Sequence, residues 1–279
     1  MTQWDIAVRY HDFKNKRSYQ HLSKQLRKLS ALEILRRAQE ILGSVVHPMQ
    51  ARVGLLAEMP AQAEGIDFDF DETLENSPMA VVGEEVLSEQ DIFMSYQLPK
   101  RYPLILCVDT SLSMTGEKLA LTAVALAVVL LEFPHDPIGI VAFENEAKIL
   151  KSPDERISIE ALVERFLDVP AQGYTHLESG MRSALKLVKQ ARALGQGAIP
   201  STVLLTDGKY TAGRDPSYLA AKFPHLMVLK MGRERSSLEL CRELARRGQG
   251  LLREVDDLES LPQIMYGVVK SLLLGHSLR

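Results

Sequence analysis

Cysteine is scarce in this chain, which has only Cys107 and Cys241 among its 279 residues. Two cysteines are too few for a disulfide-framed secreted scaffold or for a cysteine-rich zinc site. There is no basic excess either, because the formal net charge is −3 and the sequence pI is about 6.2. A nucleic-acid-binding domain usually has a pI above about 9, so the composition argues against that class of protein.

Apolar runs are short. The longest one, Leu119–Leu131, is broken by Thr122 and has 13 residues, whereas a helix that crosses a bilayer needs about 20. The first residues of the chain contain no apolar stretch after a basic head, so we expect no secretory signal. These absences predict a cytoplasmic protein without structural disulfides or metal thiolates, and they argue against extracellular adhesion.

Charge is distributed unevenly over the first hundred residues. Residues 1–50 contain nine Lys or Arg and four Asp or Glu, whereas residues 51–100 contain two and eleven. This asymmetry predicts a helical and acidic N-terminal extension over residues 1–99, followed by a main domain over residues 100–279. A single core can include about 250–300 residues, so the independence of the extension stays open.

Within the extension, the apolar spacing predicts a long amphipathic helix over residues 19–42. The sequence allows three interpretations of the basic face of this helix. The face is solvated, or it docks an acidic partner, or it pairs with the acidic residues 67–75. That face carries Arg27, Lys28, Arg36 and Arg37. Residues 67–71 alternate Asp and Phe as a strand does, and no strong period follows up to residue 100.

From Tyr102 onward, strand-like and helix-like segments alternate. Continuous apolar runs are typical of strands buried on both faces, as in parallel sheets. Helical spacing separates these runs. The pattern predicts an α/β fold with an open, mostly parallel sheet and helices on both faces. The expected strands are 104–108, 138–143, 147–150, 202–206, 226–231 and 250–255, and the expected helices are 116–133, 158–167, 178–194, 217–223, 238–247 and 258–274.

Oxygen-bearing side chains follow two of the predicted strands. Asp109, Ser111 and Ser113 come directly after the first strand, Asp207 follows residues 202–206, and Thr175 lies between them. In open α/β sheets, ligands bind in the crevice outside the carboxyl ends of the strands. Carboxylate and hydroxyl oxygens without sulfur or imidazole suit a hard cation, Mg²⁺, Mn²⁺ or Ca²⁺. Two carboxylates and three hydroxyls would leave one coordination position open.

This ordered set of five residues resembles the metal-ion-dependent adhesion site of von Willebrand factor A domains, over about residues 102–274. Leu112 departs from the pattern, because many members have glycine there. The resemblance implies that Asp109, Ser111, Ser113 and Thr175 hold the metal, with Asp207 acting directly or through water. It also implies that an Asp or Glu of a partner protein fills the open position. A metal-gated binding module and not an enzyme is therefore expected.

The extension narrows the resemblance further. Together with the acidic residues and the stretch Thr73–Asn76, it resembles the bacterial CoxE-like group, whose genes often accompany those of MoxR-type AAA+ ATPases. That resemblance implies an adaptor to such an ATPase, which remodels a client protein or helps to load metal into it.

Other interpretations of the same residues stay open. Asp109, Ser111 and Ser113 are also typical helix caps, as is Thr175, and the Thr-Asp-Gly at Asp207 is also a plain turn. A metal-dependent hydrolase or phosphatase using the same oxygens is the alternative function, although no Cys or Ser nucleophile has an evident base partner. Nucleotide binding is disfavoured because neither glycine-rich phosphate motif is present. His176 is a candidate rim residue or a solvated loop histidine, and Glu144 and Glu146 are candidate rim residues or part of a polar hairpin turn.

Overall fold

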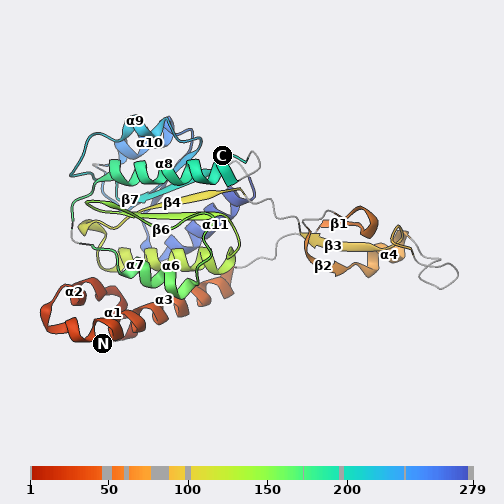
Figure 1. Cartoon of the computed structure of the whole chain (residues 1–279), viewed down its shortest axis with the longest axis horizontal. Helices are drawn as coiled ribbons and strands as arrows, with labels where there is room; N and C mark the ends of the chain where they lie inside the picture. The colour runs from red at the N-terminus through yellow and green to blue at the C-terminus, as the bar shows by residue number, and fades with distance from the viewer. Residues whose placement is uncertain are drawn as a thin grey trace. The chain divides into compact units, whose positions relative to one another are not determined.

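The chain forms two compact units in the computed structural model (Figure 1). Unit 1 comprises Met1–Val45 and Arg101–Arg279, and unit 2 comprises Val46–Lys100. The expected extension over residues 1–99 is thus divided between the units, and its expected end at residues 99 and 100 lies outside the described residues. The structure describes residues 2–45, 52–59, 63–76, 88–97, 102–171, 173–194, 198–235 and 237–275.

Unit 1 is built on a six-stranded sheet with the order β6-β5-β4-β7-β8-β9. Neighbouring strands are parallel except for β6, which runs antiparallel to β5. The strands are β4 (Leu104–Asp109), β5 (Ile138–Phe143), β6 (Ala147–Lys151), β7 (Ser201–Thr206), β8 (Leu226–Met231) and β9 (Leu252–Val255). The predicted fold class, an open and mostly parallel α/β sheet, is confirmed.

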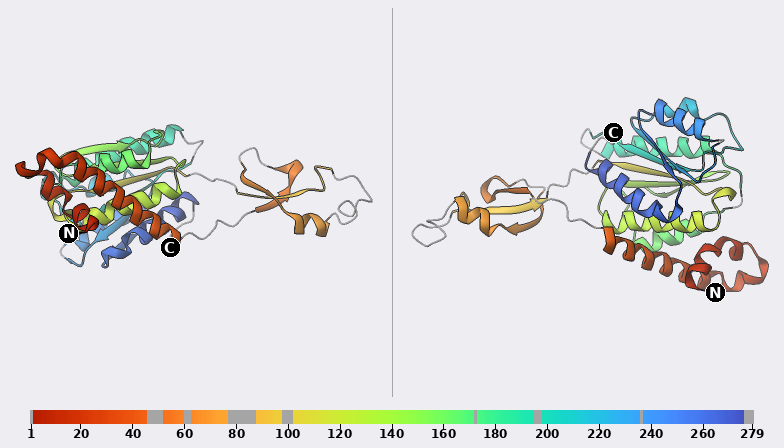
Figure 2. Two further views of the ribbon diagram at one scale, coloured as in Figure 1. Left: turned by 90° about the horizontal axis from the view of Figure 1, so that it is seen from below. Right: turned by 180° about the vertical axis from the view of Figure 1, so that it is seen from behind.

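Helices cover both faces of this sheet (Figures 1 and 2). One face packs against α6, α7 and α11, and the other packs against α8, α9 and α10. The helices are α6 (Glu117–Glu132), α7 (Ile159–Leu167), α8 (Leu177–Leu194), α9 (Ser217–Ala220), α10 (Leu238–Arg247) and α11 (Leu261–Leu273). The last of these begins after a 3₁₀ turn at Leu258–Ser260, and α9 ends earlier than expected.

A third layer of helices lies outside α6 and consists of α1 (Gln3–Val8), α2 (Tyr10–Lys14) and α3 (Ser23–Val45). Because α6 has the sheet on one side and α3 on the other, every residue from Leu119 to Leu130 is buried. On α3, Ala31, Ile34 and Ala38 are buried at helical spacing. The long helix was predicted, but it begins at Ser23, after a 3₁₀ turn over Arg17–Leu22, and α1 and α2 were not expected.

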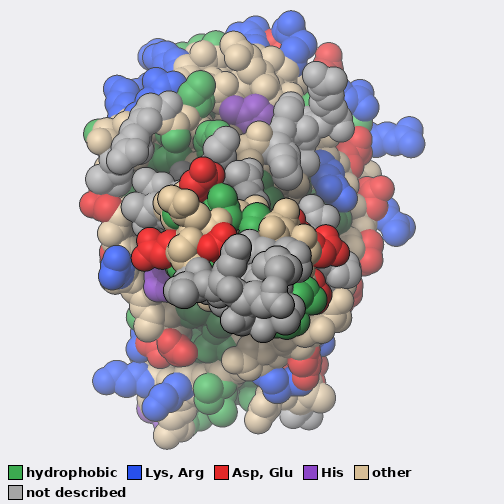
Figure 3. All heavy atoms as spheres, turned by 90° about the vertical axis from the view of Figure 1, so that its right-hand side faces the viewer, with side chains coloured by type: hydrophobic (Ala, Val, Ile, Leu, Met, Phe, Trp, Pro, Cys, Tyr) green, Lys and Arg blue, Asp and Glu red, His purple; other side chains and the backbone are tan. Residues whose placement is uncertain are grey.

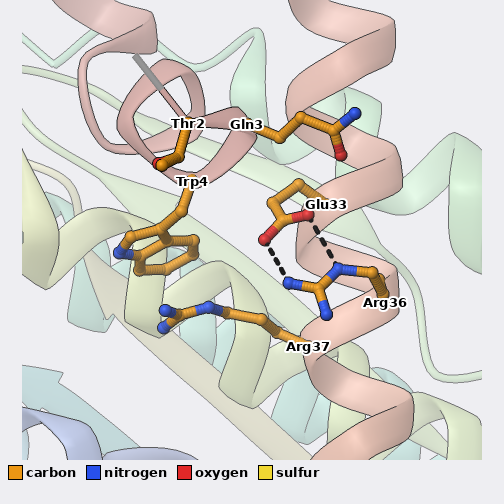
Figure 4. A pocket seen from close by; sticks show the side chains of 6 residues that line it. All are labelled: Thr2, Gln3, Trp4, Glu33, Arg36 and Arg37. Carbon is orange, nitrogen blue, oxygen red and sulfur yellow. Dashed lines mark hydrogen bonds and ion pairs between the residues drawn. The ribbon is translucent and has the colours of Figure 1, made fainter.

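Three of the four basic residues of the predicted helix face pair within unit 1. Arg27 forms an ion pair with Asp168 at 2.7 Å, and Arg36 forms one with Glu33 at 2.7 Å. The Arg37 guanidinium lies 3.6 Å from the centre of the Trp4 ring. These two residues line a surface pocket between α1 and α3, where Figure 4 shows the guanidinium beside the indole. The contacts of Arg27 and Arg37 attach α3 to Asp168 and to α1, whereas the Arg36 pair lies within α3.

Unit 2 is a three-stranded antiparallel sheet with the order β1-β3-β2 and one helix. Its elements are β1 (Arg52–Leu55), a 3₁₀ turn (Leu56–Glu58), β2 (Glu64–Phe68), α4 (Phe70–Asn76) and β3 (Phe93–Gln97). The expected strand over residues 67–71 is wrong beyond Phe68. Asp69 ends it, because its Oδ1 accepts a hydrogen bond from Glu72 N at 3.1 Å and so caps α4.

Apolar side chains in unit 2 stay largely exposed. Among its described residues only Thr73 is buried, whereas Phe68 and Phe70 are 50% and 54% exposed. Figure 3 shows red acidic and green hydrophobic side chains next to one another on the face turned to the viewer. No helix among the described residues is long and apolar enough to cross a membrane.

A buried histidine makes the stability of unit 1 depend on pH. His11 on α2 is 6% exposed, its Nε2 has no hydrogen-bond partner, and burial lowers the pKa of its imidazole to about 4. In the unfolded chain that pKa is about 6.5, so the unfolded state binds more protons between these values. The stabilisation is complete above about pH 6.5 and is lost as the pH falls toward 4.

We therefore expect urea unfolding to give a lower free energy of unfolding at pH 5 than at pH 7. His11 should account for a change of about 3 kcal/mol in that free energy between pH 6.5 and pH 4. In His11→Phe this part of the pH dependence should disappear, because the neutral ring has no proton to gain. The exposed His21 provides the control, and His21→Phe should keep the original profile. An unchanged slope in His11→Phe would contradict the assignment.

Candidate metal-binding site

Two carboxylates lie at the carboxyl ends of neighbouring strands. Asp109 is the last residue of β4, and Asp207 follows directly after β7. The chain runs from β4 to β5 on one side and later crosses to β7 on the other, so the strand order reverses at β4. Such a reversal is the usual position of a ligand site in open α/β sheets. Asp109 is fully buried and Asp207 is 4% exposed.

The loop after β4 gathers three of the predicted residues. Asp109 Oδ1 accepts a hydrogen bond from Ser111 N at 2.9 Å, and the hydroxyl oxygens of Ser111 and Ser113 lie 3.2 Å apart. Ser111 is buried and Ser113 is exposed. The carboxylate and the two hydroxyls therefore form one cluster, which is open to solvent at Ser113.

Thr175 lies on a loop that contacts both strand ends. Leu112 N donates to Gly173 O at 3.2 Å, which joins this loop to the one after β4. Thr175 N donates to Thr211 Oγ1 at 3.0 Å, and Thr211 N donates to Thr175 O at 3.1 Å. The loop is thereby also attached to the segment after Asp207. The structure thus brings the segments that carry all five predicted residues together at one edge of the sheet.

The capping interpretations are wrong for these residues. Ser111 precedes only a 3₁₀ turn, and Gly116 is the N-cap of α6; neither makes a side-chain capping bond. At the start of α8, Ser179 N donates to His176 Nδ1 at 3.2 Å, so His176 provides this cap. The hydroxyls of Ser111 and Ser113 and the carboxylate of Asp109 are therefore not spent on a helix terminus.

Three further polar side chains support the site, and we did not predict these roles. Thr206 Oγ1 donates to Asp109 Oδ2 at 2.7 Å, Ser237 Oγ donates to Asp207 O at 2.5 Å, and Glu144 Oε2 accepts from Gly173 N at 2.8 Å. Thr206 carries a weak sequence signal, because it is the last residue of a buried strand. Glu144 follows β5 and was expected only as a candidate rim residue; its contact with Gly173 spans 29 residues of chain and was not predicted. Ser237 contacts Asp207 over 30 residues and carries no sequence signal.

Comparison with known proteins agrees with this geometry. The family model of the von Willebrand factor type A domain matches residues 104–209, a span that contains all five predicted residues. The chain contains a von Willebrand factor type A domain. Its β4 and β7, with the polar loops that follow them, lie within the matched span.

Two curated relatives share the von Willebrand factor type A region. The inter-alpha-trypsin inhibitor heavy chain H4 of Bos taurus is 32% identical over 123 residues, which cover 42% of this chain and 13% of that protein. The magnesium-chelatase 60 kDa subunit of Cereibacter sphaeroides is 33% identical over 162 residues, which cover 57% and 26%. The chain thus spans only a small part of the length of these relatives.

Solved structures show the same fold. A von Willebrand factor type A protein from Catenulispora acidiphila has a TM-score of 0.51 and 18% identity, with 64% of this chain and 44% of that chain covered. Proximal thread matrix protein 1 from the mussel byssus, solved with a zinc-occupied metal-ion-dependent adhesion site, has a TM-score of 0.50 and 18% identity, with 61% and 47% covered.

The electrostatics of this von Willebrand factor type A domain suit a cation. Burial raises the pKa of Asp109 to about 6, the hydrogen bonds from Ser111 and Thr206 oppose the shift, and the nearby charge of Asp207 adds to it. A buried carboxylate is costly unless a positive charge compensates it. Among the described residues, no group of three or more His, Cys, Asp or Glu side chains is arranged to hold a metal. A cation here would therefore rely on hydroxyl oxygens as well as carboxylates, which is a hard-cation donor set.

Proposed function

We propose that the von Willebrand factor type A domain is a cation-dependent protein-binding module. Asp109, Ser111, Ser113 and Thr175 hold the cation, and Asp207 acts directly or through a water molecule. One observation carries this proposal: a fully buried Asp109 carboxylate adjoins paired serine hydroxyls at the edge where the strand order reverses. The all-oxygen donor set favours Mg²⁺, with Mn²⁺ or Ca²⁺ as substitutes.

Each residue has a separate task in this module. Asp109 supplies negative charge, and Ser111 N and Thr206 Oγ1 hold its two carboxylate oxygens in place. Ser113 is exposed, so it marks the side from which a partner approaches. When bound, the cation supplies an open coordination position for a carboxylate. The partner therefore presents an Asp or Glu side chain.

The hydrolase or phosphatase alternative gains no support at this edge. His176 is the histidine next to Thr175, and its Nδ1 already accepts a hydrogen bond from Ser179 N. We therefore propose a binding role without catalysis.

We further propose that the chain acts in the cytoplasm as an adaptor for a MoxR-type AAA+ ATPase that remodels a client protein or loads metal into it. The likeness to the magnesium-chelatase 60 kDa subunit supports this proposal, since that name denotes a subunit of a magnesium chelatase.

A pull-down with the full chain tests the function. In Mg²⁺ we expect a specific partner to be retained. In EDTA we expect its recovery to fall at least tenfold, because the partner's carboxylate loses the cation that it coordinates. Mass spectrometry then identifies the partner, and an AAA+ ATPase is the expected result. Retention that EDTA leaves unchanged would contradict cation gating, and a partner that is not an ATPase would overturn the adaptor role alone.

A further inference from the structure

Large apolar side chains are exposed on every loop that carries a proposed ligand. Leu112, Tyr174 and Tyr210 are 61%, 68% and 40% exposed. Leu112 lies between Ser111 and Ser113, Tyr174 immediately precedes Thr175, and Tyr210 follows three residues after Asp207. Single exposed apolar residues are ordinary on protein surfaces. Three of them on the loops of one site call for a functional explanation.

Hydrogen bonds between their loops hold these three residues near one another. Leu112 N donates to Gly173 O, the residue before Tyr174, at 3.2 Å. Thr175 and Thr211, which directly follow the two tyrosines, are joined by bonds of 3.0 and 3.1 Å. We call Leu112, Tyr174 and Tyr210 the apolar rim.

The backbone at Gly173 and Tyr174 is held in place by hydrogen bonds to neighbouring side chains. Tyr174 N donates to Asn145 Oδ1 at 2.8 Å, and Gly173 N donates to Glu144 Oε2 at 2.8 Å. Asn145 packs so closely that a Cβ added to Gly173 would lie 2.3 Å from Asn145 Nδ2. The contacts with Glu144 and Asn145 therefore fix the backbone of this loop, while the Tyr174 side chain stays exposed.

Positive charge adjoins the rim. Lys118 Nζ donates to the backbone carbonyl oxygen of Ser113 at 3.2 Å, so an ammonium group is held against the loop that carries Leu112. An acidic group that approaches this edge meets a cation and apolar side chains together. A partner with an acid among polar neighbours would leave the rim exposed to water.

We propose that the apolar rim determines which partner the site accepts, and that the partner's Asp or Glu lies between aromatic or large aliphatic side chains. This inference rests on the proposed cation-dependent function and adds the chemistry of the partner to it. Covering the rim removes apolar surface from water, which favours association. The cation then binds the carboxylate of the partner, and the apolar rim contacts the side chains on either side of that acid.

Synthetic nonapeptides with a central Phe-Asp-Phe, Ser-Asp-Ser or Phe-Asn-Phe test this proposal against the full chain in Mg²⁺ and in EDTA. By fluorescence polarisation, we expect the Phe-Asp-Phe peptide to bind at least tenfold more tightly than the Ser-Asp-Ser peptide in Mg²⁺. The Phe-Asn-Phe peptide, and every peptide in EDTA, should bind at least tenfold more weakly than Phe-Asp-Phe in Mg²⁺.

Variants of the rim separate it from the cation site. Leu112→Ser and Tyr174→Ser should each reduce the preference for Phe-Asp-Phe several-fold while leaving the calorimetric affinity for Mg²⁺ unchanged. Ile199→Ser is the matched control, because Ile199 is also 61% exposed but precedes β7 at the opposite end of that strand. It should leave both quantities unchanged.

The outcomes distinguish the two proposals. If Mg²⁺ binds but the Phe-Asp-Phe and Ser-Asp-Ser peptides bind equally, or neither binds, the rim proposal is overturned and the cation site stands. If Mg²⁺ itself does not bind, the proposed function fails. A preference that survives Leu112→Ser and Tyr174→Ser would also overturn the role of the rim.

Discussion

Replacing Asp109 with alanine should abolish cation binding and leave unit 1 folded. Asp109 is fully buried at the end of β4, and its carboxylate accepts a hydrogen bond from Ser111, whose hydroxyl oxygen lies 3.2 Å from that of Ser113. Outer-shell partners of a metal ligand are worth about 10–100-fold in affinity, so we expect the loss of this carboxylate to cost more than about 100-fold. Calorimetric titration with MgCl₂ measures the effect directly.

Stability should change little in Asp109→Ala, because two effects oppose each other. The change leaves Ser111 N and Thr206 Oγ1 without their acceptor, and an unmade buried hydrogen bond costs about 1–3 kcal/mol. It also removes a buried carboxylate whose pKa is raised by desolvation to about 6. Removing this desolvation cost stabilises the folded state. Circular dichroism should therefore show the same fold.

Asp109→Asn is the control for shape. The amide oxygen still accepts the bond from Ser111 N, and the Thr206 hydroxyl can turn to accept from the amide nitrogen. Only the charge is lost, so this variant should also fail to bind Mg²⁺. Undiminished Mg²⁺ binding in both variants would sink the proposed ligand set.

Placing a carboxylate at Ile34 should unfold unit 1. Ile34 lies on α3, is fully buried and belongs to the core shared with α6. Burying an unpaired charge there is among the few changes that cost more than about 4 kcal/mol. Urea unfolding of Ile34→Asp should show this loss in the free energy of unfolding, or no folded baseline at all.

The same helix provides a matched control. Leu32 lies two residues away on α3 and is 58% exposed, so Leu32→Asp should change the free energy of unfolding by no more than about 0.5 kcal/mol. Similar losses in the two variants would mean that α3 packs on unit 1 differently from what the structure shows. A small effect of Ile34→Asp would mean that α3 is dispensable for the fold.

Much of the sheet was predictable because burial on both faces leaves a simple trace in the sequence. The strands β4, β5, β7 and β8 are apolar over most of their length and do not show the alternation of a partly exposed strand. The polar residues Thr202 in β7 and Lys230 in β8 are themselves buried. Asp109 and Asp207 stand out because they end such runs. Parallel strands bring their carboxyl ends to one edge, so order along the chain was enough to group the ligands.

Unit 2 was not predictable in the same way. Its strands β1 and β3 are short, and their described side chains are not buried, so no alternation of burial marks them. The alternating Asp and Phe residues predicted a strand that continues to residue 71, past the end of β2 at Phe68. A capping aspartate cannot be distinguished from any other polar residue until the helix after it is known. Supporting contacts of the site such as Glu144 to Gly173 depend on tertiary structure alone.

Unit 2 is inserted into the chain of unit 1, between Val45 at the end of α3 and Arg101 before β4. The two parts of unit 1 are therefore separated in sequence by the whole of unit 2. The helix α3 precedes the insertion and packs on α6, which follows it. The entropy of closing such a loop grows only with the logarithm of its length, about 0.6 kcal/mol for each doubling. The insertion can therefore lengthen or shorten with little thermodynamic consequence for unit 1, whereas the order of synthesis obliges α3 to wait for α6 before it can bury its apolar side.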